Sequence, residues 1–201
     1  MYNFLNYNIV VEKISTLLIT LEEHITNRGT FKYLSCLNPH SYVESLKNKN
    51  FSSSLKSSSW IVPDGSGVVL GYFFLNYKKI SRITGYDVFI NLSNKLNRTG
   101  NFKIFFLGSS NQNLRKIKTK YIEQYPNLQV VGLYSPPYKD KYTIDELNVI
   151  KSKINNSKAD VLWVGLTAPK QELIMFNLKH DLDVSFAAGI GAVFDYYTSK
   201  V

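Results

Sequence analysis

Short apolar runs alternate with stretches of helical periodicity along most of this chain. A first amphipathic helix is predicted because Ile14, Leu17, Leu18, Leu21 and Ile25 recur at helical spacing. The rest of the first half predicts a strand over 31–37, a helix over 39–47 with proline in its first turn, and a short strand over 60–62 that ends at Pro63. Between them, the serine-rich stretch 52–59 is expected to be a loop or a weak short helix.

The second half continues the alternation more cleanly. It predicts strands over 103–107, 129–132, 161–164 and 184–187, and helices from an Asn111 N-cap to about 125, over 143–154 and over 170–178. Thr143 and Glu146 have the spacing of a capping box. Because these strands are apolar without alternation and are separated by helices, they indicate a parallel sheet covered on both faces. We find no internal repeat or flexible linker and expect one domain over residues 1–201.

The charge and the cysteine content of the chain give information on its binding partners and its cellular compartment. The chain has 24 Lys and Arg against 15 Asp and Glu, a net charge of +9. That excess fits an anionic partner or a general bias of composition, and charge alone leaves both open. A lone cysteine, Cys36, favours a cytoplasmic protein. The first 28 residues lack the pattern of a signal peptide, and the apolar run 68–75 is far shorter than the ~20 residues that span a bilayer. A position on a membrane surface remains open.

Several predicted strands end in glycine-containing loops: 63–67, 108–111, 165–171 and 189–191. In open α/β sheets, ligands bind beyond the carboxyl ends of the strands, and glycines there allow a close approach of the backbone. None of the loops matches the dinucleotide-binding fingerprint or the Walker A loop. One such loop would be most simply a tight turn, but four on one sheet edge favour a ligand site.

Asp64, in the loop 63–67, is the most informative carboxylate. It is expected to act either as a general base on an incoming hydroxyl or as the N-cap of a helix from Gly67. His24, His40 and His180 are dispersed without ligand spacing, so we expect no metal site. If a diphosphate ligand binds at these loops, Lys, Arg or helix dipoles would have to hold it in place of a metal.

Motifs from Asn38 to Asp195 resemble the WecG/TagA/CpsF family of bacterial glycosyltransferases, glycosyltransferase family 26. They include Val62-Pro-Asp-Gly-Ser-Gly67, Arg82-Ile-Thr-Gly-Tyr-Asp87, Phe106-Leu-Gly108, Ser135-Pro-Pro-Tyr138, Ala159-Asp-Val-Leu-Trp-Val-Gly-Leu166, Pro169-Lys-Gln-Glu172 and Gly191-Ala-Val-Phe-Asp195. Each motif alone is weak, but their number and order make the resemblance specific.

The resemblance implies a Rossmann-like α/β fold, with a mostly parallel sheet and helices on both faces. It implies an inverting, metal-independent transfer without a cofactor. The donor would be UDP-N-acetylmannosamine, its uronic acid or a related UDP-sugar, and the acceptor a sugar on undecaprenyl diphosphate in teichoic acid, enterobacterial antigen or capsule synthesis. A cytoplasmic enzyme at the inner face of the cell membrane, against an anionic surface, would fit these substrates.

The resemblance also suggests roles for single residues. Asp64 matches the proposed base, Asn38 and Gln171 match polar groups that hold the sugar, and Arg82 lies in a motif beside the pocket. The other expected substrate-binding residues are Cys36, Gly108, Gly165, Lys170 and Gly191. Simpler roles stay open: Asn38 as a helix cap, Lys170 and Gln171 as the start of an exposed helix, and Arg82 as a surface ion-pair partner.

The sequence departs from the family pattern at a few points. Cys36 and Thr167 replace a usual Thr and a usual Gly, and Ser109 replaces another Gly. The family continues into an Arg-Ala-Pro motif and a basic segment that closes the site, and we expect this chain to lack them. The alternatives are a catalytically impaired UDP-sugar-binding or partner-binding member, and a basic nucleic-acid-binding domain, for which no motif is present. A homo-oligomer stays open, with the apolar stretch 72–75 as core or as a subunit contact and core favoured.

Overall fold

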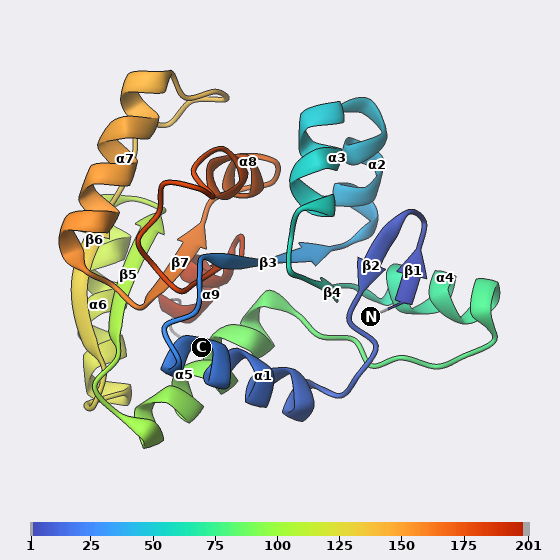
Figure 1. Cartoon of the computed structure of the whole chain (residues 1–201), viewed down its shortest axis with the longest axis horizontal. Helices are drawn as coiled ribbons and strands as arrows, with labels where there is room; N and C mark the ends of the chain where they lie inside the picture. The colour runs from blue at the N-terminus through green and yellow to red at the C-terminus, as the bar shows by residue number, and fades with distance from the viewer. Residues whose placement is uncertain (1, 199–201) are drawn as a thin grey trace.

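The computed structural model describes residues 2–198, which form an α/β fold around an eight-stranded sheet (Figure 1). The strands are β1 Tyr2–Phe4, β2 Tyr7–Ile9, β3 Lys32–Leu37, β4 Trp60–Pro63, β5 Lys103–Gly108, β6 Gln129–Tyr134, β7 Val161–Gly165 and β8 Phe186–Gly189. The helices are α1 Ile14–Thr26, α2 Pro39–Lys47, α3 Lys49–Lys56, α4 Ser66–Asn76, α5 Gly85–Thr99, α6 Asn111–Gln124, α7 Ile144–Ser157, α8 Lys170–Asn177 and α9 Val193–Thr198.

The strand order is β1-β2-β4-β3-β8-β7-β5-β6. The terminal hairpin β1–β2 is antiparallel, and the other neighbouring pairs are parallel. After β3 the chain forms β4 beside it, then crosses the sheet to form β5 and β6, and returns toward the centre to form β7. β8 enters between β7 and β3, with Lys32 opposite Phe186. This confirms the expected Rossmann-like, mostly parallel sheet.

Helices cover both faces of the sheet, as its unbroken apolar strands require. Buried side chains of α1, α5, α6 and α9 form one core on one face. Those of α7 and α8 form a second core on the other face. A third cluster joins α3 and α4 to the β1–β2 hairpin. Figure 1 shows α1 and α5 below the sheet, and α7 and α8 above it.

Most local predictions agree with the structure, and capping explains several boundaries. Pro39 occupies the first position of α2, and Thr143 with Glu146 forms the expected capping box of α7. Residues 52–56 of the serine-rich stretch belong to a short helix, α3, which Asn48 caps by accepting the N–H of Phe51 at 3.1 Å, and residues 57–59 follow the helix. The cap of α6 is Ser110 instead of Asn111, whereas β8 starts two residues later than predicted.

The expectation of core for the apolar stretch 72–75 is wrong for its outer half. Tyr72 is buried, but Phe74 and Leu75 are 64% and 62% exposed on α4. The helix is apolar nearly all round, so periodicity does not reveal which face is covered. Within the described part of the chain, we find no helix with the length and apolar character needed to cross a membrane.

Candidate functional site

A cavity of about 490 Å³ opens at the carboxyl ends of β3, β4, β7 and β8. This is the edge at which open α/β sheets bind ligands. The lining residues are Cys36, Asn38, His40, Ser41, Asp64, Thr84, Gly85, Tyr86, Thr167, Ala168, Gln171, Glu172, Ile190, Gly191, Ala192, Val193 and Tyr196. The structure therefore brings together Cys36, Asn38, Asp64, Gln171 and Gly191, five of the residues expected from sequence.

A larger hollow of about 770 Å³ lies at the opposite edge of the sheet. Basic side chains contribute to it, including Lys32, Lys103 and Lys179. It lies at the amino ends of the strands and contains none of the residues expected from sequence. Two acidic residues, Asp160 and Asp183, also line it, and the Asp160 carboxylate accepts the N–H of Lys103 at 2.8 Å. We therefore place the candidate site at the carboxyl edge.

Asp64 lies half-buried in the loop between β4 and α4, and its N–H donates to the carbonyl of Leu37 at 2.8 Å. The alternative role as a helix cap is wrong: Gly65 is the N-cap of α4, without a side-chain cap. Gly65 has φ of 109°, a value that L side chains rarely adopt. The Asp64 side chain is therefore left for the cavity.

Burial raises the pKa of the Asp64 carboxyl above its ordinary value. The Arg82 guanidinium opposes this effect and lowers the pKa, while the Asp87 carboxylate adds to it. A carboxylate with a raised pKa binds a proton more strongly once ionised, which suits a general base. The electrostatics of the site thus favour proton transfer to Asp64.

The segment Arg82–Asp87 shapes one wall of the cavity. Arg82 itself is exposed and lies outside the lining, so it acts on Asp64 through its charge. Thr84 donates its hydroxyl to the Asp87 carboxylate at 2.7 Å, and Asp87 returns its N–H, which caps α5. A Cβ at Gly85 would lie 3.2 Å from the Ile190 backbone. The motif therefore brings α5 against the loop after β8.

Asn38 has the capping role that sequence left open, and it also lines the cavity. Its side-chain oxygen accepts the N–H of Ser41 at 2.9 Å at the start of α2, while its own N–H donates to the Ser41 hydroxyl at 2.8 Å. The cap fixes the side chain, so that the amide nitrogen is the group left to contact a ligand.

Gln171 and Glu172 form a buried pair in the first turn of α8. The Gln171 oxygen accepts the N–H of Gly191 at 2.9 Å, and its amide nitrogen donates to Glu172 Oε1 at 2.8 Å. Glu172 is only 1% exposed, and its Oε2 has no hydrogen-bond partner among the described residues. Burial raises the pKa of Glu172 to about 7. Glu172 is not among the residues expected from sequence, although it lies in the motif Pro169-Lys-Gln-Glu172.

Cys36 and Gly191 also line the cavity. The Cys36 thiol donates to the carbonyl of Gly189 at 3.5 Å. Burial raises its pKa well above the ordinary value, and the carboxylates of Asp64 and Glu172 add to the effect. The thiol is therefore neutral. Gly191 has φ of 60°, and no atom lies within 4 Å of a Cβ built there, so its backbone faces open space.

The remaining expected residues lie outside the lining of this cavity. A Cβ at Gly108 would collide with the Gly165 carbonyl, and a Cβ at Gly165 with the Phe194 ring. Both glycines thus permit close packing between β5, β7 and α9. Lys170 lies over the Tyr138 ring at 4.7 Å and borders a separate hollow. The expected absence of a C-terminal appendage concerns the chain beyond residue 198, outside the described residues.

Known proteins that are similar to this chain indicate the class of protein to which the site belongs. The chain is 30% identical over 196 residues to N-acetylglucosaminyldiphosphoundecaprenol N-acetyl-beta-D-mannosaminyltransferase of Bacillus subtilis strain 168, covering 98% of this chain and 74% of the relative. The proteins of the same name from Bacillus spizizenii and Staphylococcus aureus strain NCTC 8325 are 29% and 23% identical, over 87% and 82% of this chain. The chain spans 65% and 62% of their lengths.

The fold, the site and these relatives define a glycosyltransferase. The model of the glycosyl transferase WecG/TagA/CpsF family matches residues 2–201. The chain belongs to this family, which confirms the resemblance seen in its motifs.

Proposed function

We propose that this protein transfers an N-acetylmannosamine-type sugar from a UDP-sugar to a sugar on undecaprenyl diphosphate, in the synthesis of a cell-wall or surface polysaccharide. The half-buried Asp64 carboxylate, at a cavity shared with Asn38 and Gln171, is the observation that carries the proposal. The names of the relatives, which specify an N-acetylmannosaminyl group and a diphosphoundecaprenol acceptor, support it. The inner face of the cell membrane is the place where such substrates would meet the enzyme.

The proposed reaction is a single displacement. Asp64 accepts the proton of the acceptor hydroxyl, and the oxygen attacks the anomeric carbon of the donor from the side opposite UDP. The bond between that carbon and the diphosphate oxygen breaks, and its electron pair leaves with UDP. Attack from the opposite side inverts the anomeric configuration. The raised pKa of Asp64 supports this step, because a stronger base accepts the proton more readily.

We propose that the transfer proceeds without a metal ion. Among residues 2–198, no group of three or more His, Cys, Asp and Glu side chains could hold one. The charge on the leaving diphosphate must then be stabilised by cations and N–H groups. Arg82 is the cation that already influences Asp64, and its exposure leaves the guanidinium accessible to a phosphate. The amides of Asn38 and Gln171 are suited to sugar hydroxyls.

Release of UDP in the presence of UDP-N-acetylmannosamine and N-acetylglucosaminyl diphosphoundecaprenol tests the proposal. We expect Asp64→Asn to lower the rate by about 100-fold or more, in the range of general base catalysis. Asp181→Asn, at an exposed aspartate outside the cavity, is the matched control and should retain the wild-type rate. Equal UDP release by wild type and Asp64→Asn would contradict the assignment. Calorimetric binding of UDP without turnover would favour the non-catalytic alternative.

A further inference from the structure

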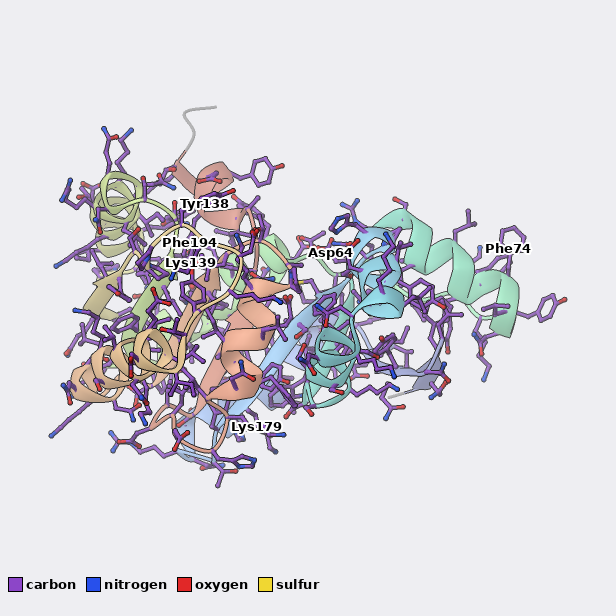
Figure 2. All side chains as sticks on the ribbon, turned by 90° about the horizontal axis from the view of Figure 1, so that it is seen from above. Asp64, Phe74, Tyr138, Lys139, Lys179 and Phe194 are labelled. Carbon is purple, nitrogen blue, oxygen red and sulfur yellow. The ribbon has the colours of Figure 1, made fainter. Side chains whose placement is uncertain are left out.

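Helix α4 is apolar on nearly all sides and yet poorly covered. Among its side chains, Val68 and Tyr72 are buried, while Leu70, Phe74 and Leu75 are exposed. A helix that is apolar all round is normally buried in a protein core or a membrane. Figure 2 shows α4 projecting at one end of the molecule, with Phe74 near its tip and Asp64 close to its beginning. An exposed apolar surface of this kind marks a binding surface.

One face of α4 forms the wall of an apolar groove of about 360 Å³. The helix contributes Gly67, Val68, Gly71, Phe74 and Leu75, which follow one another at helical spacing. Residues of the β1–β2 hairpin and of the β3–α2 junction form the opposite side. A Cβ at Gly67 would lie 2.8 Å from the Pro39 side chain, so glycine lets the two walls approach. The result is an apolar groove beside the helix.

The groove lies next to the cavity, because residues close in sequence line the two hollows. Asn38 lines the cavity and Pro39, the next residue, lines the groove. On the other side Asp64 lines the cavity, and Gly67 lines the groove three residues later. A Cβ at Gly65 would be 3.5 Å from Pro39 and 3.7 Å from Asn38, so these two segments meet at the boundary. The two hollows are therefore adjacent across this contact, and a ligand with a polar head in the cavity would place an apolar chain in the groove by passing over it.

Basic and aromatic residues follow the end of α4, just after the groove residues Phe74 and Leu75. Tyr77, which ends α4, is 87% exposed, and the exposed Lys78 and Lys79 follow it. Exposed tyrosine and lysine beside apolar side chains are typical of a membrane interface with anionic lipids. The α4 helix of 11 residues is about 16 Å long at 1.5 Å per residue. The proposed reaction site therefore lies near the start of α4, and a segment complementary to anionic head groups follows its end.

We propose that the groove along α4 binds the isoprenoid chain of the lipid-linked acceptor and guides its sugar to Asp64. This inference rests on the proposed function and adds a second recognition site for the same substrate. Its occupant is a lipid chain because the groove is apolar, lies next to the cavity, and is formed by a helix that a basic, aromatic segment follows. A second copy of this chain would not require the groove to lie next to the cavity.

Two acceptors with the same sugar diphosphate test the proposal, one carrying undecaprenyl and the other a short butyl chain. In the variant Phe74→Ser/Leu75→Ser, both replaced side chains are largely exposed, so folding should be retained. We expect its KM for the undecaprenyl acceptor to rise about tenfold or more, since apolar contacts of two side chains are lost. Its kinetics with the butyl acceptor should match those of the wild type. Ile144→Ser, at a 78% exposed residue on α7, is the control.

An unchanged KM for the undecaprenyl acceptor would overturn the proposal. An equal loss with both acceptors, together with a smaller mass in solution, would also overturn it and assign the surface to a second copy. If the wild type transfers to neither acceptor, the proposed function fails separately. In that case, calorimetry measures the binding of detergent-solubilised undecaprenyl diphosphate to the wild type and to the double variant. Binding that the double variant weakens about tenfold supports the groove, and equal binding by both proteins overturns it.

Discussion

The side-chain oxygen of Gln171 accepts the backbone N–H of Gly191 at 2.9 Å. Gln171 lies in the first turn of α8, after β7, and Gly191 follows β8, so one side chain ties together two neighbouring strand ends. The same amide donates to Glu172 at 2.8 Å. Gln171 is thus part of the framework of the cavity as well as a residue expected to contact the sugar.

Replacement of Gln171 by Ala should therefore affect both stability and substrate binding. It leaves the Gly191 N–H and the Glu172 carboxyl without their partner, which we expect to lower the free energy of unfolding by about 1–3 kcal/mol. Urea-induced unfolding measures this loss. The KM for the sugar donor should rise in the same variant. A variant with unchanged stability would show that the loop after β8 is held by other contacts.

Glu172 should make stability depend on pH. Its pKa is raised from 4.5 to about 7 in the folded state because burial disfavours the charged form. The folded protein therefore binds the proton more tightly than the unfolded chain, and stability falls as the pH rises from about 4.5 to about 7. This difference between the two states corresponds to about 3 kcal/mol at most. Glu172→Gln, which has no charge, should remove this slope in unfolding experiments between pH 5 and 8. A slope that persists in the variant would exclude Glu172 as its source.

Arg82 should set the pH range of activity. Its guanidinium lowers the pKa of Asp64, so Arg82→Gln should raise that pKa further. Because the ionised form of Asp64 is the proposed base, the acidic limb of the profile of kcat/KM against pH should move to higher pH. Arg98→Gln, at an exposed arginine on α5, is the control and should leave the profile unchanged. A lower rate with an unshifted profile would mean that Arg82 acts only on the substrate.

Gly85→Ala should destabilise the fold even though alanine favours helices. At the start of α5 the change gains up to about 1 kcal/mol of helix propensity. The new methyl group, however, would lie 3.2 Å from the Ile190 backbone and 3.3 Å from the Cys36 sulfur. Overpacking of this kind costs about 1–3 kcal/mol, so the net effect should be a lower Tm. Calorimetric unfolding distinguishes this outcome from a gain in stability.

The sequence predicted the elements whose signals are local. The proline at the start of α2, the Thr143–Glu146 capping box and the glycines at strand ends all indicated positions that the structure confirms. The parallel sheet followed from apolar strands separated by helices, which depends on pattern alone. The same reasoning placed Asp64 and Gln171 at one sheet edge, because the carboxyl ends of parallel strands share it.

Properties that depend on distant contacts could not be predicted in this way. Glu172 lies in the first turn of a helix whose start was left open as exposed or ligand-binding, and α8 packs against α3 and the sheet, where Glu172 is buried. Phe74 and Leu75 look like core residues, yet no element of the described chain covers them. The helix α5 and the β1–β2 hairpin were not predicted, although Thr84 and Asp87 have the spacing of a capping box.

The position of β8 between β3 and β7 has a consequence for folding during synthesis. β3 and β4, which carry Asn38 and Asp64 at their ends, leave the ribosome long before β8, which supplies the opposite wall. Until then one edge of β3 has no neighbour, and an unpaired edge can bind other chains. The nascent protein therefore contains its proposed base before its cavity is complete. The addition of β8 completes the cavity and, at the same step, pairs the open edge of β3.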